Sequence, residues 1–428
     1  MTKRILYTAA ALLCCLSFAR AQVSIEQCVA LAQENYPLIK KYDILNQTRD
    51  TDLSNINKCW LPQIDVYGQG TMQNAVPSFP EVLSDILAKT GADIEGLGKL
   101  QYKIGADLNQ TIWDGGKSQS GRRVAETASG AQRATLDVQL YAIRERVENL
   151  FFGVLLTEEQ IKQAEQTQNL LESNLAMLES MKSNGVTMQS DVDMVEAQLL
   201  TTGQQIIQAQ SLSQSYRSLL SIYTGTDMAT AELARPDSAI PGKMAPERPE
   251  LAMFEAQIKA NDARLEDVRA EVMPKIGFFA QAYYGYPGLN YFESMMNRNL
   301  SFNLLAGLKI KWNIGSLYTK KNNERKLRLA NDGVRADREV FLFNTRMETE
   351  SHTSRIRELK KVMANDARIT ELRTNVRRAA ESQLKNGIID ATTLLSKITD
   401  ENQARLSASY HEIQLIQSIY QLKYTLNQ

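Results

Sequence analysis

The most constraining stretch of the sequence runs from Gln119 to Ser183, which contains no proline and no strand-like alternation. Its apolar residues recur at spacings of three, four and seven, the heptad pattern of helices that pack side by side along their length. This seam comprises Leu136, Leu140, Ile143, Val147, Leu150, Val154, Ile161, Ala164, Leu171, Leu175 and Leu178. At 1.5 Å per residue such a helix is roughly 95 Å long, about three times the thickness of a bilayer core. We therefore predict a long helical strut in an elongated protein.

The N-terminus has the pattern of a secretory signal peptide over residues 1–21. Lys3 and Arg4 precede an apolar run at residues 5–18, and Ala19-Arg20-Ala21 forms a small-x-small cleavage site. No later window holds 18 apolar residues, so the sequence predicts no second membrane helix. We expect a protein that is exported beyond the inner membrane without a helical anchor there.

The four cysteines raise two alternatives, a lipid anchor and a disulfide. Cys14 and Cys15 lie inside the apolar run, and the Leu-Leu pair before Cys14 lacks the small residue usual at a lipidation site. Cys28 and Cys59 remain after cleavage, in a compartment that permits disulfides. If both lie on one continuous helix from Ser24 to about Trp60, they are roughly 45 Å apart, too far for a bridge. We predict free thiols, buried or half-buried.

Two β-hairpins are predicted from strictly alternating segments, at residues 62–113 and 274–314. In each strand one face is apolar, and the second pair of strands is the more aromatic. The apolar faces comprise Ile64, Val66, Ile104, Leu108, Ile112, Phe278, Tyr284, Phe302, Leu304, Leu308, Ile310 and Trp312. The polar loop of the first hairpin contains a short predicted helix from Glu81 to Lys89. Strands of this length and pattern are typical of membrane β-strands, although a half-buried soluble sheet has the same alternation.

The mature chain repeats one series of elements: helix, strand, loop, strand, long helix, turn, helix. The separation is 212 residues both from Pro37 to Pro249 and from Pro62 to Pro274. It is 200 residues from Gly115 to Gly315 and 202 from Gly185 to Gly387, as a shorter second hairpin loop would produce. Such constant register indicates an internal duplication. The predicted first repeat is 22–224 with a tip at 184–189, the linker is 225–247, and the second repeat is 248–428 with a tip at 385–391.

Four strands cannot close a barrel, and an open sheet edge in lipid leaves unpaired backbone groups that cost several kcal/mol each. Two copies would give eight strands, a barrel filled by its own side chains, whereas three copies would give twelve and leave a lumen. If the long helices continue the barrel wall, the lumen is the purpose of the assembly. Three copies therefore fit better than two.

The order of these motifs resembles the TolC-like outer-membrane efflux proteins over essentially the whole mature chain. The resemblance depends on Pro62 and Pro274 before the strands, on the strand-ending motifs at residues 113–116 and 315–316, and on the tips at residues 184–186 and 386–388. It implies a mainly α-helical fold with a β-barrel part: a trimeric 12-stranded outer-membrane barrel continued by a periplasmic α-helical barrel. The implied partners are outer-membrane lipid, a periplasmic adaptor protein and an inner-membrane transporter, in a Gram-negative cell. The implied function is the exit duct of a tripartite efflux or type I secretion system.

The resemblance also points to residues at the two tips. Gly185 with Val186, and Gly387 with Ile388, would be the turns that dock the adaptor, although glycine also suits any helix-hairpin turn. Asp191 matches an acidic tip position, and Asp193 and Asp390 are further candidates for a gate at the periplasmic entrance. A capping role at the helix start explains each aspartate equally well. The aspartate ring of some members, after the second tip, is replaced here by Thr393 and Ser396.

Other function classes find little support in the sequence. Lysine plus arginine and aspartate plus glutamate number 49 each, so no net field favours nucleic acid. His352 and His411 stand in separate helices, and no metal, nucleophile or phosphate-loop motif is present. We expect no enzyme and no cofactor, and we interpret Lys320-Lys321 and Arg377-Arg378 as solvated helix faces. The alternatives to a duct are a periplasmic coiled-coil adaptor and a surface stalk.

Overall fold

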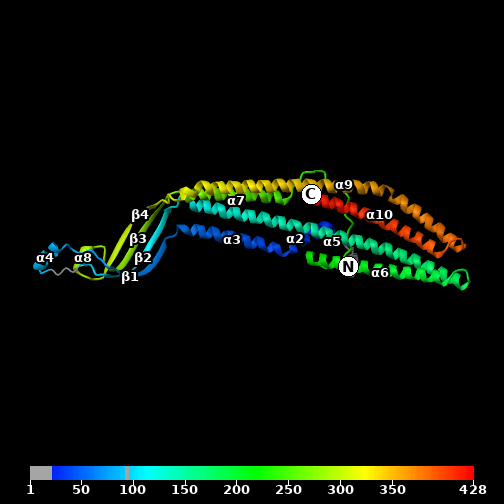
Figure 1. Cartoon of the computed structure of the whole chain (residues 1–428), viewed down its shortest axis with the longest axis horizontal. Coiled ribbons are helices and arrows are strands. Elements are labelled where there is room, and N and C mark those ends of the chain that lie inside the picture. Colours follow the sequence, from blue (N-terminus) through cyan, green and yellow to red (C-terminus); the bar gives the residue numbers. More distant parts are fainter. Residues whose placement is uncertain (1–21, 92–95) are drawn as a thin grey trace, which may run out of the picture. The chain divides into compact units, whose positions relative to one another are not determined.

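The structure is a computed structural model that describes residues 22–91 and 96–428. The predicted signal peptide, with Cys14 and Cys15, lies outside these residues. Figure 1 shows the order of the elements. The helices are α2 (Ile25–Asn35), α3 (Lys40–Asn57), α4 (Glu81–Lys89), α5 (Lys117–Ser183), α6 (Gln189–Thr224), α7 (Pro249–Glu271), α8 (Tyr291–Met296), α9 (Ser316–Lys385) and α10 (Ala391–Leu426), with 3₁₀ turns η1 (Pro37–Ile39) and η2 (Lys58–Trp60). The strands are β1 (Gln63–Met72), β2 (Leu100–Trp113), β3 (Lys275–Tyr286) and β4 (Ser301–Lys311).

The chain divides into two compact units, and each of them draws on both halves of the sequence. Unit 1 comprises Met1–Asp43, Ala134–Met253 and Ala336–Gln428, and unit 2 comprises Ile44–Arg133 and Phe254–Arg335. The compact units therefore cut across the two repeats predicted from the sequence. In unit 2 the cause is visible, since β2 from the first half pairs with β3 from the second.

Unit 2 contains one antiparallel sheet with the strand order β1-β2-β3-β4. The register pairs Ile64 with Leu108, Ile104 with Tyr284, and Phe278 with Leu308, so even-numbered residues share one face. This face is apolar and exposed: Val66, Leu308 and Ile310 are 77%, 71% and 72% exposed. A water-soluble sheet hides such a face against a core, and here no core covers it.

The odd-numbered residues form the polar face of the same sheet. Gln281 donates hydrogen bonds to the carboxylate of Asp107 (2.8 Å) and to the hydroxyl of Tyr67 (3.1 Å). The ammonium of Lys103 lies over the rings of Tyr67 and Tyr283, 5.7 and 5.3 Å from their centroids. Polar side chains thus bond to one another on one face, while the side chains of the other face are mainly aliphatic and aromatic. Within the described residues, β1 and β4 each have a sheet neighbour on one side only.

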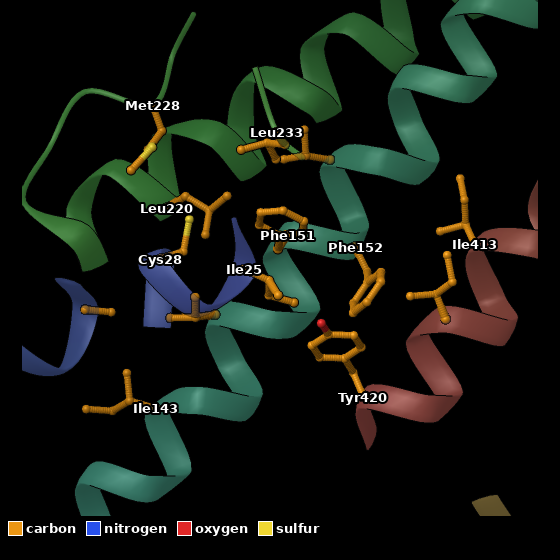
Figure 2. Close-up of a cluster of buried hydrophobic side chains, with 14 residues drawn as sticks. Ile25, Cys28, Ile143, Phe151, Phe152, Leu220, Met228, Leu233, Ile413 and Tyr420 are labelled. Atoms are coloured by element: carbon orange, nitrogen blue, oxygen red, sulfur yellow. The ribbon is translucent and has the colours of Figure 1, made fainter. Parts of the chain in front are cut away.

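In unit 1 the largest core joins α2, α5, α6 and α10 (Figure 2). Phe151 and Phe152 of α5 are 0% and 1% exposed, and the ring of Phe152 meets Tyr420 of α10 edge-on at 5.6 Å. On the other side, Ile25 and Cys28 of α2 pack with Leu220 of α6, Met228 and Leu233. Burial of these side chains stabilises the unit by about 1.5–3 kcal/mol for each large residue.

Helix α5 confirms the heptad seam as a buried stripe. Ile143, Val147, Val154, Leu171 and Leu178 are all at most 2% exposed. The N-terminal end of the helix is fixed by Asp114, whose carboxylate accepts hydrogen bonds from the backbone N–H groups of Gly116 (2.9 Å) and Ser118 (2.6 Å). Capping of this kind satisfies N–H groups that have no partner within the helix.

The prediction of one continuous helix from Ser24 to Trp60 is wrong. The chain leaves the helix at Tyr36, whose ψ is 129°, and resumes it through η1 into α3. Pro37 explains the break, because proline has no N–H and disfavours the helical conformation of the residue before it. Cys28 and Cys59 are both free thiols, as predicted; Cys28 is buried, but Cys59 is exposed. Among the described helices, none combines the length and the hydropathy that a bilayer-spanning helix needs.

Candidate functional site at the helix-hairpin tips

The candidate site is the end of unit 1 where two helical hairpins turn, α5 into α6 and α9 into α10 (Figure 1). A second core holds these four helix ends together. It comprises Leu171, Leu178, Val192, Val195, Ala380, Leu384, Ala391, Leu394 and Ile398, all at most 5% exposed. Because each hairpin contributes to this core, the two turns are fixed side by side rather than independently.

Both turns have the same backbone geometry. At the first, Gly185 N–H donates to Lys182 C=O and Val186 N–H to Met181 C=O, both at 2.9 Å. At the second, Gly387 and Ile388 make the equivalent two bonds, also at 2.9 Å. This pair of bonds is the Schellman motif, and it needs a left-handed residue after the helix. The φ angles of Gly185 and Gly387 are 73° and 69°, so glycine is required at both.

The helices that follow the two turns are capped by carboxylates at different positions. Asp191 is the third residue of α6, and its carboxylate accepts from the N–H of Met188 (3.2 Å) and the hydroxyl of Thr187 (2.7 Å). Asp390 precedes α10, and its carboxylate accepts from the N–H of Thr393 at 2.8 Å. Hydrogen bonds from Thr393 lower the pKa of Asp390. A capping box pairs a bond from the residue before the helix with a return bond from the third helical residue. The first tip has only the second of these bonds, from Asp191, and the second tip has only the first, from Asp390.

The remaining predicted residues are placed at the solvent side of the tips. Val186 and Ile388 are 61% and 69% exposed. Asp193 accepts a hydrogen bond from Gln189, which also accepts one from Lys182. The structure thus places all seven predicted residues at the same end of unit 1. Asp191 and Asp390 are engaged as caps, whereas the side chains of Val186 and Ile388 are exposed to solvent.

Behind the tips lies an ionic network that the sequence analysis missed. Glu401 of α10, with a side chain 5% exposed, accepts from Thr374 (2.8 Å), Arg405 (2.6 Å) and Arg377. Arg377 also pairs with Glu381. Burial acts to raise the pKa of Glu401, but the bonds from Thr374 and Arg405 and the charge of Arg377 outweigh it and leave the pKa lowered. The interpretation of Arg377 as a solvated residue is wrong; Arg378 beside it is exposed.

The same network lines a polar hollow of about 330 Å³ between α5, α9 and α10. Its walls are amide and hydroxyl groups of α5, including Gln163, Gln166 and Thr167, facing Arg377 and Glu401. Among the described residues, no group of three or more histidine, cysteine, aspartate or glutamate side chains could hold a metal ion. A signal for the network was present in the sequence, since Arg377–Glu381 and Glu401–Arg405 are both spaced by four residues on a helix.

Comparisons with known proteins give one family model over part of the chain and one fold over nearly all of it. Residues 31–226 match the model of the family described as outer membrane efflux protein. The described fold is similar to the CusC channel (TM-score 0.68, 13% identity, 95% of this chain and 92% of that one). It is also similar to the open MtrE outer membrane channel of Neisseria gonorrhoeae (0.67, 14%, 94% and 88%) and to the CmeC outer membrane channel of Campylobacter jejuni (0.66, 13%, 94% and 85%). Among curated proteins, none matches the chain.

Proposed function

We infer that this chain is a TolC-like outer membrane efflux protein, and we propose that it is the passive exit duct of a tripartite efflux or type I secretion system. The observation that carries the proposal is the exposed apolar face of the four-stranded sheet, where Val66, Leu308 and Ile310 are more than 70% exposed. Hydrocarbon on the outer face and hydrogen-bonded polar groups on the other match a barrel wall between lipid and a water-filled lumen.

The open edges of the sheet support assembly into a trimer. Strands β1 and β4 have a free edge each in the described chain, and unpaired backbone groups are not tolerated in lipid. Pairing β4 of one chain with β1 of the next satisfies both edges, and three copies close a twelve-stranded barrel wide enough for a lumen. The long helices α5 and α9 would continue this wall into the periplasm.

The tips support docking to a periplasmic adaptor. Two exposed aliphatic residues, Val186 and Ile388, stand on rigid turns that a common core holds side by side. Burying these side chains against a partner would remove apolar surface from water, which favours association. Asp191, Asp193 and Asp390 stay predictions as gate residues, and Asp191 and Asp390 also cap their helices.

The direct test is to purify the protein in detergent, measure its oligomeric mass, and record conductance in a planar bilayer. We expect a trimer and a discrete ion conductance. A single-chain protein that stays soluble without detergent would contradict the proposal. Cell fractionation distinguishes the duct from the adaptor alternative. An adaptor would be recovered in the soluble or inner-membrane fraction and not in the outer-membrane fraction.

Replacing Gly185 or Gly387 with valine tests the tips. No atom lies within 4 Å of a Cβ at either position, so the expected harm comes only from the left-handed backbone, which costs a β-branched residue about 1–2 kcal/mol. We expect the turn to rearrange, dye efflux from cells that depend on this channel to fall severalfold, and trimers to persist on a gel.

The matched control is Gly203→Val in α6. Its Cβ would also meet nothing within 4 Å, but Gly203 has no positive φ. We expect normal efflux from this variant. Normal efflux from both tip variants would count against the docking role of the turns.

A further inference from the structure

A cationic hollow lies on the polar face of the sheet in unit 2, apart from the helix tips. Its volume is about 390 Å³, and its lining includes Lys117, Lys275, Lys309, Lys311 and Asp114. The last three lysines belong to β3 and β4, and all three are exposed. Because these lysines are odd-numbered, they share the face that carries Gln281 and Asp107, opposite the apolar face.

The sheet register concentrates the positive charge. Lys275 and Lys311 are directly opposite each other, and Lys309 lies opposite Gly277, two residues further along the same face. Like charges directly opposite across a strand pair are destabilising. Among the described residues, no carboxylate lies within 4.0 Å of any of these three ammonium groups. The charge repulsion among these three lysines is therefore not neutralised by an ion pair within the described chain.

The carboxylates of Asp114 and Asp267, in the lining and bonded to it, are already engaged, and that of Asp107 lies further along the sheet. Asp114 accepts hydrogen bonds from Gly116 and from the N–H and hydroxyl of Ser118, and Lys117 pairs with Asp267 at 2.8 Å. Asp107 pairs in register with Gln281, and Gln281 with Leu305. Four residues of strand separate Leu305 from Lys309, roughly 14 Å, which exceeds the Debye length of about 8 Å at physiological salt.

We propose that this cationic hollow binds anionic groups, phosphate or carboxylate, of solutes in transit and gives the duct a preference for anions. A concave surface lined by one sign of charge raises the local concentration of the opposite sign, and ammonium groups bind phosphate as strong charge-assisted donors. The conductance preference rests on the proposed function, because the polar face lines a lumen only if the chain forms the proposed duct. Anion binding does not depend on the proposed function, since a single chain supplies the whole hollow.

Inorganic pyrophosphate is the probe for binding, titrated calorimetrically into the detergent-purified protein. We expect the triple variant Lys275→Gln, Lys309→Gln, Lys311→Gln to lose affinity by about tenfold or more, because three charge-assisted contacts disappear. The corresponding triple arginine variant should retain binding. The matched control is Lys320→Gln, Lys321→Gln, Lys326→Gln on α9, which removes the same charge outside the hollow. Equal affinities for the two glutamine variants, or no binding by the natural protein, would overturn the proposal.

The reversal potential in a KCl gradient tests the preference for anions. We expect the natural channel to favour chloride, the glutamine triple variant of the hollow to shift towards potassium, and Asp65→Asn on the same face to shift the opposite way. A conducting channel with unchanged reversal potential in the triple variant would refute the selectivity. A protein that binds pyrophosphate but never conducts would refute the duct and leave the anion site standing.

Discussion

Replacing Leu304 with lysine should abolish the outer-membrane trimer that we propose. Leu304 is 62% exposed on the apolar face of β4, near the middle of the strand. A lysine at the lipid face near the bilayer midplane costs about 2–4 kcal/mol, and a trimer bears this cost three times. The measurement is the amount of trimer on a semi-native gel of the outer-membrane fraction, which we expect to fall below detection.

The neighbouring residue gives the control for this experiment. Leu305 is also leucine and 43% exposed, but it lies on the polar face, in register with Gln281 and beyond it Asp107. Leu305→Lys should leave the trimer intact, because an ammonium there meets polar groups and a carboxylate. If Leu304→Lys and Leu305→Lys assemble equally well, the apolar face does not meet lipid.

Replacing Glu401 with alanine should destabilise the tip end of unit 1 by about 3–5 kcal/mol, the usual effect of removing one partner from a buried ion pair. Arg377, with a side chain 12% exposed, would lose its Glu401 partner, and Arg405 would lose its own. We expect the thermal unfolding midpoint of the detergent-purified protein to fall by about 5 °C or more. The stabilisation should also depend on pH. Since the pKa of Glu401 is lowered from 4.5, its contribution is complete above pH 4.5 and is lost as pH falls through the folded pKa.

Asp400→Ala is the control for Glu401, one residue earlier on the same helix. Asp400 pairs with Arg373 at 2.9 Å, but both side chains are more than a third exposed. Exposed pairs contribute about 0–1 kcal/mol, so the midpoint should hardly move. If the unfolding midpoint falls by a similar amount in both variants, the buried ion pairs of Glu401 stabilise the protein no more than an exposed pair does.

Elements with strong periodicity were predictable from the sequence. The seam of α5 is buried where the heptad pattern puts it, and helix α4 has the predicted bounds. The alternating strands have the predicted apolar faces, because side chains on a strand change sides at every residue. The capping alternative holds for Asp191 and Asp390 but not for Asp193, and it was predictable because a cap bonds to a residue only three positions away.

Features that depend on pairing between distant segments were not predictable. The opposition of Lys275 and Lys311 follows from the register of β3 and β4, which no local pattern fixes. The burial of Arg377 depends on α10 bringing Glu401 against it, 24 residues away. The break at Tyr36-Pro37 is local and was predictable in principle, because proline disfavours a helical conformation in the residue before it.

In the trimer that we propose, the different capping groups of the two tips would bear on how a ring of partner subunits fits against them. Three chains would present six turns of one backbone shape, with Met188 and Asp390 alternating at the residue that starts the second helix. A hexameric ring of identical subunits could seat on all six by shape. Side chains, however, would repeat only three times around the circle. A partner ring rotated by sixty degrees would therefore meet turns of the same backbone shape but with different side chains. This difference could favour one rotational orientation of the ring over the other.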